Sequence, residues 1–152
     1  MLVWRVTRKI YAANALSGEG AARAGNRWNS KGLRMAYAST SRSLAVLEML
    51  VHVTRETVPA DTVLVPVEVP DDLISEMEHP PEGWDEFPYP DSAKIAGDRW
   101  AREQSSAALL VPSAVLRPEK NLLINPAHPD FPKIRMHSPE ENALDPRIFG
   151  FV

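Results

Sequence analysis

The placement of proline restricts the fold of this chain more than any other feature of its sequence. The chain has 14 Pro against 7 Gly, and every Pro except Pro59 lies after residue 65. Proline ends α-helices and is excluded from central strands, because it lacks a backbone N–H and fixes φ. Four of the prolines fall within residues 80–90. The second half of the chain is therefore not expected to form a long helical bundle.

Composition narrows the class of protein further. A chain of 152 residues that is 44% hydrophobic suits one globular domain over residues 1–152. The net charge of −3 disfavours general attraction to nucleic acid or to an anionic membrane. Cysteine is absent, which excludes disulfides, zinc–thiolate sites and thiol nucleophiles. No signal peptide or membrane-spanning run is recognised, so we expect a cytoplasmic protein with no direct nucleic-acid or membrane partner.

Hydrophobic alternation predicts most of the strands. It is clearest at residues 61–70, where Val63, Val65, Val67 and Val69 alternate, and Pro66 indicates an edge position. Residues 17–33 contain four Gly and are expected to form a long loop, and residues 71–91 are expected to form a Pro-rich connection. The remaining strands are predicted at residues 2–7, 35–39, 107–116 with an interruption at Pro112–Ser113, 122–124, 134–136 and 147–151.

Two helices complete the predicted layout. The first begins at a cap on Thr40 or Ser41 and runs to about Glu56, with apolar residues around most of its circumference, so it is expected to be buried on most sides. Glu48 lies at the edge of that apolar face, where a carboxylate faces either solvent or a cleft. The second helix is predicted at residues 92–103. Mixed strands and helices of this kind indicate an α+β fold.

Familiar enzyme motifs are missing from the sequence. The four His residues form neither a His-Glu-x-x-His motif nor a four-residue pair, so no metal site is expected. Gly18-x-Gly20 is not followed by the third Gly of a dinucleotide-binding loop, and no Gly-Lys-Ser/Thr or Gly-x-Ser-x-Gly occurs. These observations exclude the commonest nucleotide-binding and hydrolase signatures.

Four dispersed polar residues remain as candidates, and each also has an ordinary structural interpretation. Arg27 could be a solvated loop residue, and Tyr37, at a strand centre, could be a core aromatic. Glu48 could belong to a solvent-facing stripe, and Ser113 could simply end a strand beside Pro112. Spacing alone does not make these four residues a site.

A resemblance to a known family connects them. Five stretches occur in order: Gly-Asn-Arg-Trp-Asn-Ser-Lys-Gly at 25–32, Ala-Tyr-Ala-Ser-Thr-Ser-Arg-Ser-Leu-Ala-Val-Leu-Glu at 36–48, Gly-Asp-Arg-Trp at 97–100, Leu-Val-Pro-Ser-Ala-Val at 110–115, and Asn-Leu-Leu-Ile-Asn-Pro-Ala-His-Pro-Asp-Phe at 121–131. Together they resemble the RES domain, a family named for an Arg, a Glu and a Ser. The resemblance runs from about Trp4 to Phe131, most of the chain.

The resemblance implies a fold, a substrate and a partner. RES domains are toxins of bacterial toxin–antitoxin pairs with an Xre-like, helix-turn-helix antitoxin. Their fold resembles ADP-ribosyltransferases, with a split sheet and an NAD-binding cleft, and they consume NAD⁺ as substrate without a metal. By motif, the family's residues fall on Arg27, Tyr37, Glu48 and Ser113. Asn26 differs from the Gly expected more often before the Arg, which could stiffen the loop.

The chemistry of NAD⁺ cleavage suits these residue types. Breaking the nicotinamide–ribose bond produces an oxocarbenium-like ribose, which a carboxylate such as Glu48 stabilises. Arg27 suits the pyrophosphate, and Tyr37 offers a flat face to the nicotinamide ring. Ser113 is expected to hold the ribose or a phosphate. Asn125 and Arg5 are further candidates for contact with the substrate.

Several alternatives stay open at this stage. ADP-ribose could pass to water, to phosphate or to a side chain of a target protein, and a homodimer is possible. A non-catalytic, antitoxin-binding module is a second reading, and direct nucleic-acid binding or RNA cleavage a poorer third, given the acidic pI of about 5.8. The acidic, aromatic stretch 82–89 is either an antitoxin contact or a loop packed on its own core.

Overall fold

A mixed sheet of eight strands forms the centre of the protein. The computed structural model describes residues 1–149. The strands follow the order β4-β5-β6-β2-β1-β3-β7, with β8 also paired to β3, and all pairs are antiparallel except β4 with β5. Their bounds are β1 Leu2–Arg8, β2 Ala36–Ser39, β3 Thr62–Glu68, β4 Ile74–Glu76, β5 Ala108–Pro112, β6 Lys120–Ile124, β7 Arg135–Met136 and β8 Glu140–Glu141.

The sheet is split between β1 and β2. These two strands are paired at one position, Trp4 with Ser39, whereas β1 pairs with β3 along its whole length, from Leu2 to Arg8. Beyond that position Arg5 donates from Nη1 to the backbone carbonyl of Tyr37 at 2.6 Å. At this point the Arg5 side chain, and not a ladder of backbone hydrogen bonds, connects β1 to β2. The predicted α+β fold with a split sheet is confirmed.

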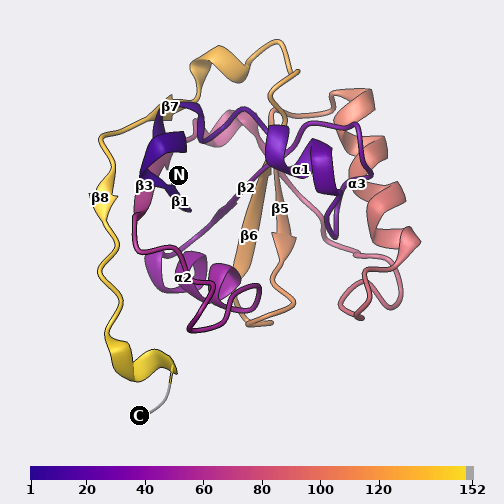
Figure 1. Cartoon of the computed structure of the whole chain (residues 1–152). Helices are drawn as coiled ribbons and strands as arrows, with labels where there is room; N and C mark the ends of the chain where they lie inside the picture. The colour runs from indigo at the N-terminus through magenta and orange to yellow at the C-terminus, as the bar shows by residue number, and fades with distance from the viewer. Residues whose placement is uncertain (150–152) are drawn as a thin grey trace.

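Both faces of the sheet are covered by apolar side chains. On one face Leu122 and Ile124 of β6 join Val65 and Val67 of β3 in a core. On the other, Leu123 packs with Trp100 beneath α3, Asp91–Glu103. Alternation along β6 therefore sends successive side chains into different cores, as pleating requires. Figure 1 shows α1, Glu19–Ala24, and α3 together on the β5 side, and β1 and β3 on the opposite side.

Helix α2, Arg42–Leu50, begins where the sequence predicts and ends earlier. Ser41 caps it by accepting a hydrogen bond from Leu44 N at 3.1 Å. The prediction that it continues to Glu56 is wrong, since β-branched residues follow and Thr54 N donates to the Thr57 hydroxyl in a turn. The prediction that it is buried on most sides is also wrong. Only Leu44 and Ala45 are buried, and Val51 is 57% exposed.

Other departures from the prediction arise from short elements. Residues 17–33 contain α1, which follows Gly18 at φ 70°. A side chain at that glycine would meet Met35 N at 2.6 Å, so glycine is required there. The 71–91 connection contains β4 and one 3₁₀ helix. Residues 147–149, predicted as strand, belong to another 3₁₀ helix, and the rest of that predicted strand lies outside the described residues. The 3₁₀ helices are Lys9–Asn14, Asp71–Leu73, Phe131–Lys133 and Pro146–Phe149.

Pro66 does not place β3 at an edge, which corrects another expectation. β3 lies between β1 on one side and the short strands β7 and β8 on the other. β7 pairs with Val67 and Glu68, and β8 pairs with Val63 and Leu64. Pro66 lies just beyond the residues that pair with β7, where its carbonyl accepts from His137 N at 2.9 Å and its missing N–H costs the sheet one hydrogen bond. Over residues 1–149 no helix has the length and apolar character to cross a bilayer.

Candidate active site

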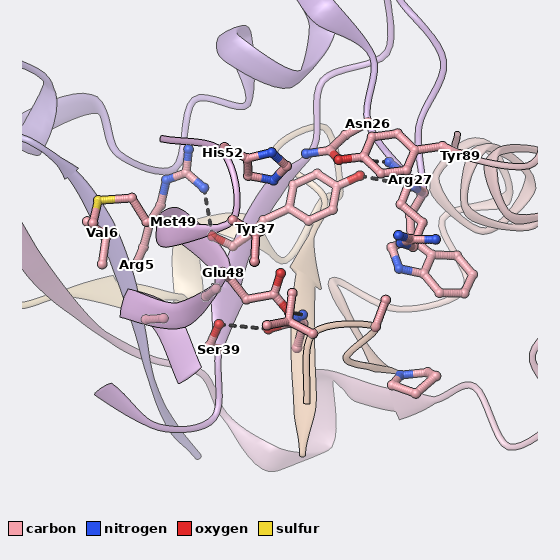
Figure 2. Close-up of a pocket in the computed structure, with 18 of the residues that line it drawn as sticks. Arg5, Val6, Asn26, Arg27, Tyr37, Ser39, Glu48, Met49, His52 and Tyr89 are labelled. Carbon is pink, nitrogen blue, oxygen red and sulfur yellow. Dashed lines mark hydrogen bonds between the residues drawn. The ribbon is translucent and has the colours of Figure 1, made fainter. Parts of the chain in front are cut away.

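A cleft of about 680 Å³ opens beside the split in the sheet. Its walls come from β1, β2 and α2, from the loop around Arg27, and from segments 85–89 and 112–115. Figure 2 shows Glu48 of α2 and Tyr37 of β2 projecting toward the same cavity. Arg5, Arg27, Tyr37 and Glu48 line this cleft. The structure therefore brings together four of the six residues that the sequence singles out.

Glu48 is held by one of its two carboxylate oxygens. Oε1 accepts a hydrogen bond from Ser113 Oγ at 2.7 Å and another from Asn121 Nδ2 at 2.5 Å. Oε2 has no hydrogen-bond partner among residues 1–149. One oxygen is thus fixed by the protein and the other is left for whatever enters the cleft. The sequence left open whether Glu48 faces solvent or a cleft, and in the structure it faces the cleft.

Ser113 lies behind Glu48 and does not line the cleft. It is 0% exposed, at the end of β5. Its Oγ accepts from Val115 N at 3.1 Å and Leu116 N at 3.0 Å, which directs the hydroxyl hydrogen to Glu48. In this structure Ser113 touches the carboxylate and has no surface open to a ribose or phosphate.

Asn121 is a cleft residue that the sequence analysis did not single out. It lies on β6 opposite Ser39 of β2, and Ser39 Oγ donates to its Oδ1 at 2.7 Å. Both residues line the cleft. A polar residue directly before the apolar run Leu122–Ile124 was the available signal, but only the β2–β6 register shows what it faces.

Tyr37 connects the cleft to the loop at residues 28–29, which precedes β2 in the chain. Its hydroxyl donates to Asn29 Oδ1 at 2.7 Å and accepts from Trp28 N at 3.2 Å. Burial raises the pKa of Tyr37 far above its usual value, and the hydrogen bond from Trp28 opposes this more weakly. The side chain therefore stays a neutral phenol, with its ring on the cleft.

Arg27 links the cleft to the segment 84–89, which we call the strap. Nη1 donates to the carbonyl oxygens of Trp84 at 2.6 Å and Glu86 at 2.9 Å, and Cζ lies 4.8 Å from the centre of the Tyr89 ring. These bonds use both hydrogens of Nη1. Nη2 and Nε have no partner within the described chain, so the remaining N–H groups are available to an anion.

The strap is attached at further points. The Trp84 ring stacks on Trp28 with 5.9 Å between centroids, and Asp85 forms an ion pair with Arg117 at 2.6 Å. Phe87 is 82% exposed at the mouth of the cleft. Of the two interpretations of the stretch 82–89, Trp84 supports packing on the protein's own core and Phe87 supports an exposed contact.

The last two candidates, Arg5 and Asn125, differ in their placement. Arg5 lines the cleft, and its Nε is buried without a partner among residues 1–149. Burial lowers the pKa of its guanidinium. Asn125 does not line the cleft. Its amide donates to Ala101 O at 2.8 Å and accepts from Ala127 N at 3.0 Å, so it supports the turn after β6.

Comparison with known sequences identifies the family. The sequence profile of the RES domain matches residues 2–145. This chain belongs to the RES domain family, as its motifs predict. A protein of Sphingobium sp. (strain YBL2) named "Prs ADP-ribosylating toxin" is 41% identical over 95% of this chain and 94% of its own length. A "Toxin Res" of Yersinia enterocolitica is 34% identical over 97% of this chain and 99% of its own.

A solved structure agrees with the fold. The Mycobacterium tuberculosis MbcT–MbcA toxin–antitoxin complex contains a chain that superposes with a TM-score of 0.74, over 97% of this chain and 86% of that chain. The two sequences are 20% identical. At that identity the likeness establishes the α+β architecture.

Proposed function

We propose that this protein is the toxin of a toxin–antitoxin pair and that it consumes NAD⁺ by cleaving the nicotinamide–ribose bond. The observation that carries the proposal is the carboxylate of Glu48, fixed through Oε1 by Ser113 and Asn121 with Oε2 free in the cleft. A pre-oriented negative charge in a cleft is what a cationic transition state requires. The family, and relatives named as toxins, support the same reading.

The proposed reaction balances without a general acid for the leaving group. The glycosidic electron pair goes to the nicotinamide nitrogen, which leaves neutral, and C1′ of the ribose becomes oxocarbenium-like. Glu48 Oε2 accepts a hydrogen bond from a ribose hydroxyl and stabilises the cation. The acceptor then forms a bond to C1′ and loses its proton to solvent.

The other lining residues bind the substrate in this scheme. Arg27 presents Nη2 and Nε to the diphosphate while Nη1 stays on the strap. Tyr37 lays its ring against the nicotinamide. Ser113 acts through Glu48, and Arg5 acts through the Tyr37 carbonyl that it holds. Asn125 is not part of the proposed site.

We assign the acceptor to a protein side chain. The supporting observation is the name of the Sphingobium relative, an ADP-ribosylating toxin at 41% identity. Water and inorganic phosphate are the competing acceptors, and both give products that are not attached to protein. The proposed partner is an Xre-like antitoxin that covers the cleft, with the exposed Phe87 in its contact surface. The neighbouring structure is itself that of a toxin–antitoxin complex.

The test combines two readouts on protein purified without antitoxin. Nicotinamide release from NAD⁺ reports cleavage, and transfer of label from adenylate-labelled NAD⁺ to protein in a cell extract reports the acceptor. We expect release that an extract accelerates, together with labelling of a discrete protein. Fast release without labelling would assign the acceptor to water or phosphate. No release under either condition would overturn the enzymatic proposal and leave the antitoxin-binding module.

A further inference from the structure

The strongest unexplained feature of the cleft is a relay of side chains that ends on Glu48. Ser39 Oγ donates to Asn121 Oδ1 at 2.7 Å, and Asn121 Nδ2 donates to Glu48 Oε1 at 2.5 Å. The three residues come from β2, β6 and α2, so the relay crosses from the sheet to the helix. Ser39 is 4% exposed, although it lines the cleft.

The direction of the relay follows from donor and acceptor chemistry. A carboxylate oxygen only accepts, so the atom of Asn121 that faces Glu48 has to be its NH₂ group. The carbonyl end of the same amide then faces Ser39, whose hydroxyl must donate to it. A flipped amide would place oxygen against the carboxylate oxygen. Glu48 therefore selects the orientation of the amide, and Ser39 holds the carbonyl end of that amide in place without touching Glu48.

We infer that Ser39 and Asn121 are positioning residues that fix the orientation of Glu48 for catalysis, with Ser39 acting through the Asn121 amide. The inference rests on the proposed function, because it assigns these residues to the same carboxylate. Ser113 is the second donor to Oε1. Two donors on one oxygen prevent rotation of the carboxylate and keep Oε2 directed at the substrate.

An isosteric pair of variants separates the hydroxyl from the shape of residue 39. Ser39→Thr and Ser39→Val add the same bulk at a buried site, and only the threonine can donate to Asn121. We expect the kcat for nicotinamide release to be about tenfold lower in the valine variant than in the threonine variant. A rate change of this size corresponds to the free energy of about one hydrogen bond. KM for NAD⁺ is expected to be equal in the two. Asn121→Leu is expected to lower kcat by about 100-fold.

A matched control exists elsewhere in the sheet. Ser75 on β4 shares a 2.7 Å hydrogen bond with Ser106 and does not line the cleft. Ser75→Thr and Ser75→Val repeat the same exchange there. They are expected to differ in thermal stability and to have the same kcat.

A second readout tests the relay without activity. In isotope-labelled protein, the Asn121 side-chain amide, assigned by its loss in Asn121→Leu, is expected to give a shifted, slowly exchanging NMR signal. That signal is expected to persist in Ser39→Thr and to move to the position of a solvated amide in Ser39→Val. Equal kcat and equal amide signals in the two variants would overturn the inference. If wild-type protein released no nicotinamide while the amide signals differed, the proposed function would fail and the relay would stand as structure only.

Discussion

Ser113 donates its hydroxyl hydrogen to Glu48 at 2.7 Å, although 65 residues separate them in the sequence. Two backbone amides, those of Val115 and Leu116, occupy the acceptor side of the same oxygen. The hydroxyl is therefore oriented by the turn that follows β5. This contact explains how a fully buried serine can matter to a cleft that it does not reach.

Removal of that hydroxyl tests its positioning role. Ser113→Ala leaves Glu48 Oε1 with Asn121 as its one side-chain donor and leaves two backbone amides without their acceptor, so we expect kcat for nicotinamide release to fall at least about tenfold. The free energy of unfolding is expected to fall by about 1–3 kcal/mol, measured with denaturant. KM for NAD⁺ is expected to stay the same. A rise in KM with unchanged kcat would instead mean that Ser113 contacts the substrate.

Arg27 is expected not to tolerate even the conservative replacement by lysine. Lysine keeps the charge but lacks the planar guanidinium, which holds two carbonyl oxygens and, in the proposed function, also binds the diphosphate. We expect Arg27→Lys to raise KM for NAD⁺ about tenfold, the loss of one charge-assisted contact, and to speed hydrogen exchange in residues 84–89. Arg99→Lys, on the exposed side of α3, is the matched control. An unchanged KM together with unchanged exchange would contradict the dual role of Arg27.

Gly97 of α3 lies against the backbone of Trp28. A Cβ there would stand 1.9 Å from the carbonyl oxygen of Trp28, within the segment that carries Arg27. Gly97→Ala is therefore expected to lower the free energy of unfolding by about 1–3 kcal/mol, the cost of overpacking. Gly20→Ala in α1 meets nothing within 4 Å and is expected to be neutral or to stabilise the protein by about 0.5–1 kcal/mol. Equal effects in denaturant unfolding would contradict this packing.

The ion pair between Arg42 and Glu140 gives a prediction about acid stability. It joins α2 to β8 through two hydrogen bonds of 2.7 and 2.8 Å. The hydrogen bond from Arg42 lowers the pKa of Glu140 below its usual value. A carboxyl with a lowered folded-state pKa stabilises the protein above its unfolded-state pKa and loses that contribution as the pH falls through the folded-state value.

The thermal midpoint should record this loss. In wild-type protein we expect Tm to fall as the pH is lowered from about 5 to about 3, the range in which carboxylates protonate. Glu140→Gln is expected to start from a lower Tm at neutral pH and to show a shallower fall over the same range. Curves that coincide for the two proteins would show that the pair contributes nothing to stability.

Local patterns in the sequence predict the parts of this fold that local interactions determine. Valine alternation locates β3, and Ser41 marks the start of α2. The predicted end of α2 comes too late in the chain because the apolar residues after Leu50 indicate a buried helix that continues. In the structure, Val51 and Val53 instead border the cleft. Apolar content alone does not distinguish a core from the rim of a binding site.

The site was predictable only in part for a similar reason. The motifs predict that Arg27, Tyr37 and Glu48 belong to one site, and in the structure all three line the cleft. Asn121 reaches Glu48 through the register of β2 against β6, which is a long-range pairing that no neighbouring residue encodes. Asn125 looks equally polar in the sequence, but its amide supports the turn after β6.

The central claim is that the negative charge of Glu48 drives cleavage of the nicotinamide–ribose bond, and Glu48→Gln tests it most directly. Glutamine keeps an oxygen that can accept from Ser113 and Asn121, so the variant removes the charge and little else. The measurement compares nicotinamide release by wild-type protein, by Glu48→Gln and by the control Glu103→Gln, which changes an exposed carboxylate on α3. A loss of at least about 100-fold in Glu48→Gln alone, with unchanged Tm, is the predicted result. Release at the wild-type rate by Glu48→Gln would contradict the account.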